Sequence, residues 1–353
     1  MRCPLPRWAE TTTTRSLAPG LGPMPIFFGV LALLAAALAG VTFGPAGLRA
    51  PSVLGEILDR LPGIELASGL SERQVDIVFD LRLPRVVLGG LVGATLAVSG
   101  AAYQGVFRNP LVDPYLLGVA AGAGLGATLA FAGAGARAEL VPIAAFVGAV
   151  GAVIITYAVG NRLGERTSAT LVLAGVAVAS FLTAAQTYVQ QRSAGDLRVV
   201  YTWILGRLST GWSDVALIVP YVFVSGVAIL LHRRLLDVLA VGESEAETLG
   251  LPVARVRLIV VAAATLGTAA AVAVSGLIGF VGIVVPHTVR LLAGNSYRAV
   301  LPLSLLFGAA FMIGTDLAAR TLVAPAELPI GVVTAFFGAP FFLSLLRRRA
   351  IYG

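Results

Sequence analysis

Apolar segments long enough to cross a lipid bilayer recur along almost the whole chain. A transmembrane helix needs about 20 mainly apolar residues. Hydrophobic residues make up 58% of the chain and charged residues 12%, and a soluble fold of this size has no interior that hides so much apolar surface. Ten segments approach the required length, and they lie at 26–43, 86–106, 115–132, 140–160, 168–190, 214–231, 258–275, 277–292, 300–320 and 329–346.

The sequence therefore predicts an all-α membrane protein with about ten transmembrane helices. The count falls to nine if the seventh and eighth segments, broken only at Ser275-Gly276 and Pro286, form one helix. Residues 1–24 are polar and rich in Thr, and we expect a flexible N-terminal tail there, followed by a membrane domain over 25–353. Ten spans place both termini on one side, and the Arg347–Arg349 run predicts that this side is cytoplasmic.

The basic residues exclude one way of binding ATP, because all 25 of them are Arg and the chain has no Lys. The ATP-binding loop G-x-x-x-x-G-K-[ST] needs its Lys on the phosphates, so this chain does not hydrolyse ATP through such a loop. A single Cys and two His predict neither a metal cluster nor an internal disulfide. We expect no catalytic residue, no metal and no cofactor in this chain. We also expect no nucleic-acid partner, because Arg at loop ends explains the net charge of +7.

The connection 234–257 is the most polar interior stretch and falls on the predicted cytoplasmic side. Ser244 and Glu247 have the spacing of a capping box, and Gly250 followed by Pro252 is a typical helix stop. The pattern predicts a helix of barely two turns. It is either an ordinary capped loop or a knob that inserts into a groove on a cytoplasmic partner, and the missing ATP-binding loop favours the partner.

The outer connection 44–85 contains apolar residues at helical spacing, with charged residues opposite them. We expect a short amphipathic helix there, lying on the membrane surface or capping the bundle. Arg82 and Arg85 end this connection, either as snorkelling anchors or as a docking site for an acidic partner. The apolar residues of the expected helix are Val53, Leu54, Ile57, Leu58 and Leu61.

The ninth segment ends in charged residues. Asp316 and Arg320 are four residues apart, a spacing that permits an ion pair on one helix face, and Glu327 follows them. A structural pair at the outer rim is favoured. The alternative is a proton relay, which would make the chain an ion-gradient-driven secondary transporter. Polar residues also end the second segment, where we expect them at the inner interface: Gln104, Arg108 and Asn109.

Several motifs resemble one known family. Ser99-Gly100, Gln104 and the run RNPLVDP at 108–114 resemble the signature of the FecCD-type permeases, the membrane subunits of type II ATP-driven importers of iron chelates, haem and vitamin B12. The resemblance covers the chain from about residue 80 to its C-terminus, in family order. It continues through LRLPR at 81–85, LVLAG at 171–175, GFVGIVVPH at 279–287, DLAAR at 316–320, ELPIG at 327–331 and GAPFF at 338–342.

The resemblance implies a permease of ten helices in a bacterial inner membrane that works as a homodimer. It also implies two separate cytoplasmic ATP-binding subunits, which hold ATP and Mg²⁺, and an extracytoplasmic substrate-binding protein. The short cytoplasmic helix corresponds to the coupling helix of the family, with Glu243, Ser244, Glu245, Glu247, Thr248, Leu249 and Gly250. Arg82, Arg85 and Arg320 match arginines that dock the binding protein, and Thr167-Ser168 opens the pore-lining helix and inner gate. The remaining family-motif residues are Gln104, Arg108, Asn109, Pro110, Pro286, His287, Asp316 and Glu327.

The mechanism that the resemblance implies is alternating access. ATP-driven motion of the partner subunits is transmitted through the coupling helix and opens the path to the docked binding protein. Ferric siderophores, haem and cobalamin are all handled by relatives with these motifs, and a ferric siderophore is expected on the breadth of the family alone.

Overall fold

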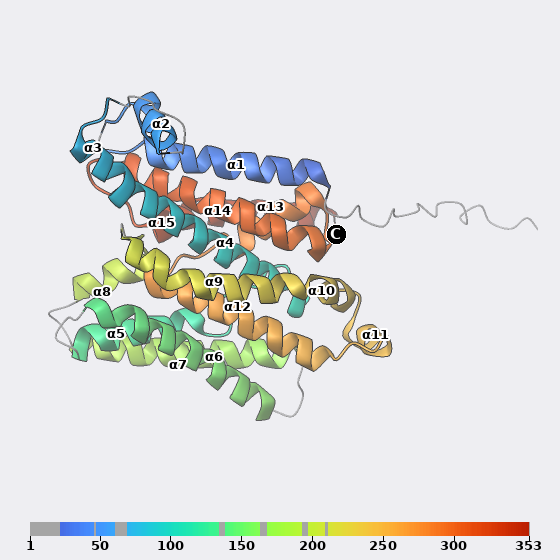
Figure 1. Ribbon diagram of the computed structural model, residues 1–353. Helices are drawn as coiled ribbons and strands as arrows, with labels where there is room; N and C mark the ends of the chain where they lie inside the picture. Colours follow the sequence, from blue (N-terminus) through green and yellow to red (C-terminus); the bar gives the residue numbers. More distant parts are fainter. Residues whose placement is uncertain are drawn as a thin grey trace, which may run out of the picture.

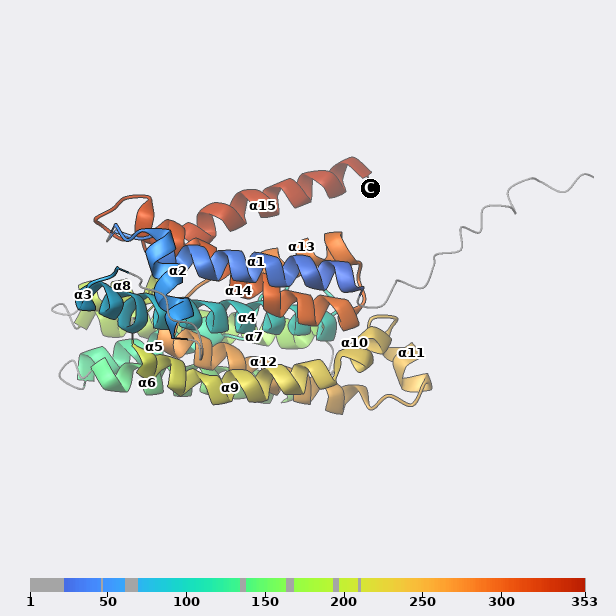
Figure 2. The same ribbon diagram turned by 45° about the horizontal axis from the view of Figure 1, so that its top comes forward.

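A computed structural model describes residues 22–45, 47–60, 69–133, 138–162, 168–192, 197–208 and 211–352. Within these ranges every regular element is a helix. The long helices run roughly side by side in one bundle (Figures 1 and 2). The N-terminal tail expected at 1–24 lies almost wholly outside the described residues.

Each of the ten predicted spans coincides with a helix, which confirms the predicted fold class. In the described part of the chain, seven helical segments are long and apolar enough to cross a membrane, while α5, α13 and the apolar part of α15 are shorter. The ten helices are α1 (Pro23–Thr42), α4 (Leu83–Val106), α5 (Val119–Gly133), α6 (Val141–Arg162), α7 (Ser168–Arg192), α9 (Trp212–Leu231), α12 (Val253–Ser275), α13 (Val281–Ala293), α14 (Tyr297–Thr321) and α15 (Ile330–Tyr352).

The outer connection is shorter than predicted, because α4 extends backwards beyond its apolar part. The helix α3 (Glu72–Asp76) and the π-helical segment η1 (Ile77–Arg82) precede α4 without a break. A capping box at Ser71 and Gln74 begins this extension. The prediction of a loop up to residue 85 is therefore wrong, and Arg82 and Arg85 project from a helix instead of a loop.

Shorter helices lie at the two ends of the bundle. The expected amphipathic helix forms as α2 (Ala50–Asp59), with Val53 fully buried in a small apolar cluster beside α1 and η1. Leu61, the last apolar residue predicted for this helix, lies outside the described residues. The helix α8 (Leu197–Ile204) and the 3₁₀ turn η2 (Ala138–Leu140) were not predicted. At the other end, α10 (Arg233–Leu239) and α11 (Glu243–Thr248) fill the polar connection.

The helix α4 lies at the centre of the bundle and packs against α14, α12, α13 and α9. Glycine allows the closest of these approaches, since a methyl group at Gly100 would collide with the carbonyl oxygen of Gly282 on α13. The spacing of Gly122 and Gly126 predicts tight packing, and both glycines of α5 face the backbone of α6, with no room for a side chain.

The seventh and eighth spans are separate helices joined by a short turn. The break lies at 276–280, where Gly276 and Phe280 both have a φ of 70°. Pro286 lies inside α13 and does not interrupt it. The prediction of a break at Ser275-Gly276 is confirmed, whereas the break expected at Pro286 is wrong.

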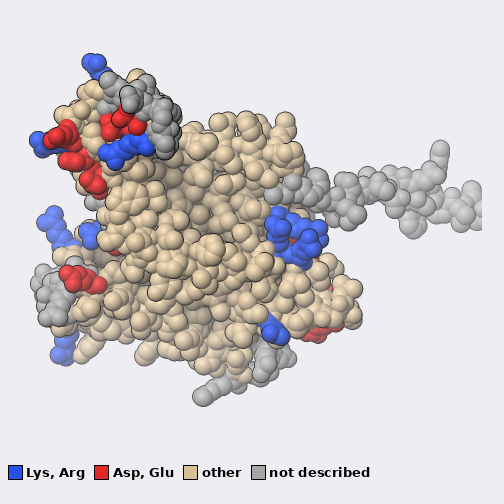
Figure 3. Space-filling model, in the orientation of Figure 1, with Lys and Arg blue, Asp and Glu red and all other residues tan. Residues whose placement is uncertain are grey.

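The two ends of the bundle differ in what they carry. The beginning of α1 and the end of α15 lie at the same end as α10 and α11, and α2, α3 and α8 lie at the opposite end (Figures 1 and 2). On the face shown in Figure 3, charged side chains gather towards the two ends, and a broad uncharged band separates them. That distribution suits a bundle embedded in a bilayer.

Candidate functional site

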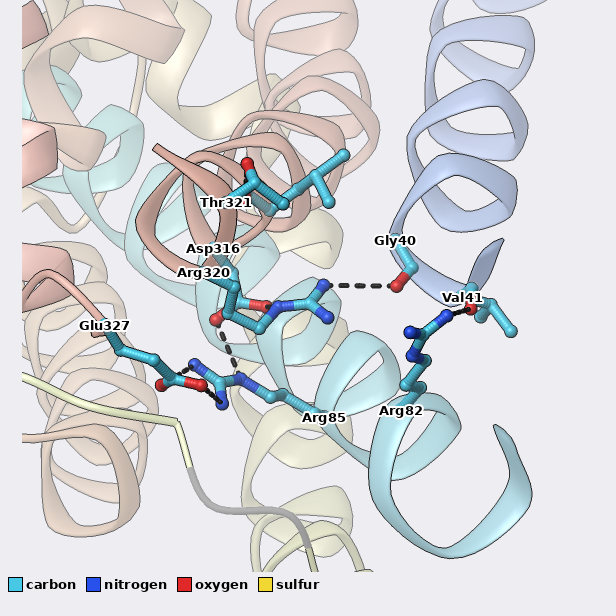
Figure 4. A network of polar contacts seen from close by, with 9 residues as sticks. Gly40, Val41, Arg82, Arg85, Asp316, Arg320, Thr321 and Glu327 are labelled. Carbon is cyan, nitrogen blue, oxygen red and sulfur yellow. Dashed lines mark hydrogen bonds and ion pairs between the residues drawn. The ribbon is translucent and has the colours of Figure 1, made fainter. Parts of the chain in front are cut away.

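A cluster of charged side chains joins four segments at the end of the bundle opposite α11 (Figure 4). Arg85, in the first turn of α4, donates from Nε to Oδ1 of Asp316 on α14 at 2.9 Å. Its Nη1 and Nη2 donate to the two carboxylate oxygens of Glu327 at 3.1 and 2.9 Å. This two-pronged geometry is the strong form of the arginine–carboxylate interaction.

Two further arginines complete the cluster and fasten it to α1. Arg320 donates from Nε to Oδ2 of Asp316 at 2.9 Å and from Nη2 to the carbonyl oxygen of Gly40 at 3.1 Å. Arg82 donates to the carbonyl oxygens of Val41 and Thr42 at 2.9 and 2.7 Å. The arginines thus donate hydrogen bonds to carbonyl groups at the end of α1, which have no partners within the helix itself.

Most side chains of this cluster are buried and do not form a solvent-exposed rim. Arg82, Arg85 and Arg320 are 5%, 8% and 4% exposed, and Asp316 is 1% exposed. For Arg82 and Arg85 we expected anchoring or docking at the outer mouth, and all three arginines that the resemblance links to docking are buried in this structure. The side chain of Glu327 is 48% exposed and forms the open edge of the cluster.

The ion pair predicted between Asp316 and Arg320 is present. Asp316 accepts hydrogen bonds from the guanidinium groups of Arg85 and Arg320, so both of its carboxylate oxygens have partners within the chain. This is the structural pair that the sequence favoured over a proton relay.

At the other end of α4, Gln104 ties three segments together. It is 1% exposed, and its Nε2 donates to the carbonyl oxygens of Gly282 at 2.9 Å and Val112 at 3.2 Å. Its Oε1 accepts a hydrogen bond from Nη1 of Arg290 at 2.6 Å. We expected Gln104 at the inner interface, and the structure instead buries it between α4, α13 and the turn after α4.

The other motif residues shape the turn after α4 and the contact of α13 with α15. Arg108 and Asn109 are exposed, Arg108 with a φ of 51°, and Asn109 Oδ1 accepts a hydrogen bond from the Leu111 amide at 3.0 Å. Pro110 continues that turn. Pro286 is buried in α13, and the ring of the neighbouring His287 packs edge-on against Phe341 of α15.

The short helix α11 projects from the end of the bundle where α1 begins and α15 ends (Figure 1). It begins two residues earlier than predicted: Gly242 is its N-cap in place of Ser244, and Ser244 and Glu247 form no capping box. The hydroxyl of Ser244 donates to Glu245 instead. The predicted stop is confirmed, since Gly250 has a φ of 81° and its amide donates to the carbonyl oxygen of Glu247 at 2.9 Å.

Two contacts fix α11 to the bundle and leave its outer face exposed. Glu243 forms an ion pair with Arg257 of α12, and Ala246 is fully buried. We did not predict Arg257 as a residue of this site. It is fourteen positions from Glu243 in the sequence, and no local spacing pattern links the two. The exposed residues of α11 and its stop are Ser244, Glu245, Glu247, Thr248, Leu249 and Gly250.

The predicted gate is only partly within the described chain. Thr167 lies outside the described residues, and Ser168 is the first residue of α7. Further along α7, Ser180, Thr183 and Thr187 are exposed. In the described residues, no group of three or more His, Cys, Asp or Glu side chains is placed to hold a metal ion.

Comparison with known proteins identifies the class that this bundle represents. Residues 30–348 match the FecCD transport family. The cobalamin import system permease protein BtuC of Halobacterium salinarum is 39% identical over 340 residues, covering 94% of this chain and 92% of the relative. The hemin transport system permease protein HmuU of Yersinia pestis is 39% identical over 284 residues, covering 77% of this chain and 84% of the relative.

A solved structure of a transporter described as metal-chelate type ABC, in an inward-facing conformation, has the same fold. It superposes with a TM-score of 0.81 at 29% identity, over 93% of this chain and 100% of the solved chain. The protein is thus a multi-pass membrane permease of the ATP-binding cassette importer class. The chain belongs to the FecCD transport family.

Proposed function

We propose that two copies of this chain form the translocation path of an ATP-driven importer for a metal chelate. Two cytoplasmic ATP-binding subunits, which hold the ATP and Mg²⁺, supply the work, and an extracytoplasmic binding protein delivers the substrate. The protein then lies in a bacterial inner membrane with both termini in the cytoplasm. The projecting helix α11 is the observation that carries this proposal.

The construction of α11 suits the transmission of force. Its stop at Gly250 and its ion pair through Glu243 fix its position against α12, while Leu249 is 72% exposed. So short a helix has little stability by itself, and a large exposed apolar side chain beside exposed carboxylates suits insertion into a groove on a partner. We therefore assign α11 to the contact with the ATP-binding subunit.

The binding protein is assigned to the opposite end, where Arg82, Arg85 and Arg320 lie below the surface. Glu327 accepts hydrogen bonds from both Nη atoms of Arg85. A carboxylate of the binding protein can therefore bind this guanidinium group only after Glu327 has moved away from it. Docking through these arginines then requires the loop before α15 to move. The gate at Thr167-Ser168 is assigned to the cytoplasmic start of α7.

The substrate class rests on the relatives. The two relatives compared above are permeases for cobalamin and hemin, and both ligands are metal chelates held in a macrocycle. We propose a metal chelate for this chain as well. A ferric siderophore is the expectation from the sequence, and cobalamin is the first alternative because the cobalamin permease aligns over nearly the whole chain.

Gentle purification of a C-terminally tagged protein from its native membrane tests the assignment. A stoichiometric ATPase partner and ATP-dependent uptake into proteoliposomes are expected, with ferric siderophore, haem and cobalamin compared as substrates. Uptake by the chain alone that a protonophore abolishes contradicts the proposal and supports the secondary-transporter alternative, with Asp316→Asn as the next variant.

A further inference from the structure

A cavity with charged walls opens at the end of the bundle opposite α11, away from the charged cluster of Figure 4. It has a volume of about 720 Å³ and lies between the first residues of α6 and α9, the helix α8 and the end of α12. Its charged lining comes from two arginines and two carboxylates: Arg198, Arg207, Glu139 and Asp214.

These four charged groups have no ionic partner in the described part of the chain. Neither salt bridges nor side-chain hydrogen bonds to the described residues involve them, in contrast to the fully paired cluster around Asp316. Glu139, Arg198 and Arg207 are exposed, and Asp214 is half-buried. Charges of both signs therefore face one cavity and are available to a ligand.

The cavity continues into an apolar groove. A second hollow, between α6, α9 and α12, shares part of its lining with the charged cavity and adds the rings of Phe146 and Tyr221. Ile143 and Leu217 are 61% and 46% exposed on this surface, as is usual for side chains that face lipid tails. The shared lining is Pro142, Ile143, Leu217, Ala273 and Val274.

We propose that this cavity binds a phospholipid with a primary-amine headgroup, of the phosphatidylethanolamine type. Arginine is well suited to phosphate oxygens, since its planar fork donates two parallel hydrogen bonds. The carboxylates of Glu139 and Asp214 accept hydrogen bonds from the ammonium group. The apolar groove has a volume of about 70 Å³, so it takes only the first methylene groups of an acyl chain, and the rest of the chain lies on the lipid-facing surface. A ligand with separated positive and negative groups complements a lining that carries two charges of each sign.

Position in the bundle supports a lipid over a soluble ligand. The charged residues belong to the end of the bundle, where headgroups lie, and the groove runs from there along helices that face the bilayer. A bound headgroup would connect α8 and the beginning of α9, which are neighbours in the sequence, with the beginning of α6, which lies much earlier in the chain.

Native mass spectrometry of the purified, delipidated protein tests the site. Phosphatidylethanolamine, phosphatidylglycerol and phosphatidylcholine are added at equal concentrations, and preferential retention of phosphatidylethanolamine is expected. The double variant Arg198→Gln/Arg207→Gln should lose about tenfold in apparent affinity, as the removal of charge-assisted hydrogen bonds predicts. Arg73→Gln is the matched control, because Arg73 is exposed at the same end and does not line the cavity.

A second pair of variants tests the ammonium contact. Glu139→Gln/Asp214→Asn should remove the preference for phosphatidylethanolamine over phosphatidylglycerol while phosphatidylglycerol is still retained. Equal binding of the three lipids to the wild-type protein, or unchanged phosphatidylethanolamine binding in both double variants, overturns the proposal.

Labelling of the wild-type protein gives an answer even if a double variant does not fold. A phosphatidylethanolamine with a photoreactive group in one acyl chain should label the stretch 217–221 of α9, and excess unlabelled phosphatidylethanolamine should suppress this labelling. Labelling spread evenly over all lipid-facing helices overturns the assigned groove.

Discussion

The two ends of this permease differ in whether their charged residues are buried or exposed. At one end, Arg85, Asp316 and Arg320 are at least nine-tenths buried and bonded to one another. At the other end, Glu245 and Glu247 of α11 stand exposed on a helix of six residues. The first arrangement fixes segments of the chain in place, whereas the second presents a surface to a partner.

This difference teaches where a substitution should act. A buried charge that loses its partner retains its desolvation cost, so changes in the cluster should act on folding. An exposed helix contributes little to the core, so changes in α11 should act on coupling. The following predictions test this division, beginning with the largest expected effect.

Removal of the shared carboxylate should be the most damaging change. Asp316→Ala leaves the buried Arg320 without a carboxylate partner and Arg85 with Glu327 alone, and it should lower the free energy of unfolding by about 3–5 kcal/mol. Unfolding of the purified protein with temperature or denaturant measures this loss. Asp80→Ala, at an exposed position on η1 at the same end, is the control and should have little effect. Equal stability of the two variants would show that the cluster is not a structural tie.

A break in α11 should act on transport and spare the fold. Proline within a helix costs about 3 kcal/mol, and Thr248→Pro should release the ATP-binding subunit or reduce substrate-driven uptake by about tenfold or more. Thr248→Ala, which keeps the backbone and loses only a hydrogen bond to the Glu245 carbonyl, is the control. Full uptake by the proline variant would remove the coupling role of α11.

Loss of the Gln104 amide should have an intermediate effect on stability. Gln104→Leu deprives Arg290 and the Gly282 carbonyl of a buried partner, and such a loss costs about 1–3 kcal/mol. Thermal unfolding compared with Gln191→Leu, at an exposed position on α7, isolates the effect of burial. An unchanged melting temperature would contradict the role of Gln104 as a tie between α4 and α13.

The smallest change in stability is expected at the open edge of the cluster. Glu327 is half-exposed, so solvent screens its ion pair with Arg85, and Glu327→Gln should cost about 1 kcal/mol or less. The same variant leaves the Arg85 fork open to the binding protein. The affinity of the binding protein for the immobilised Glu327→Gln permease should therefore rise. Unchanged or weaker docking would show that Glu327 does not compete for Arg85.

Local patterns in the sequence were sufficient for most of the fold. Span positions follow from the apolar character of consecutive residues, and the pair of Asp316 with Arg320 follows from the pitch of a single helix. The stop at Gly250 was also predictable, because only glycine adopts its positive φ without strain. The prediction of a capping box at Ser244 was wrong because Gly242 is the N-cap of α11. The extension of α4 back to Glu72 was not predicted because its first turns are polar.

The sequence by itself thus determined a ten-helix membrane protein of a recognisable family, because hydrophobicity and helix geometry act over a few neighbouring residues. Only the tertiary structure decided which charges are buried. Arg85 meets Glu327 across 242 residues and Gln104 meets Arg290 across 186, and no local pattern records such a contact. The three arginines that the resemblance links to docking are buried for the same reason: each has a partner on another helix that only packing brings near it.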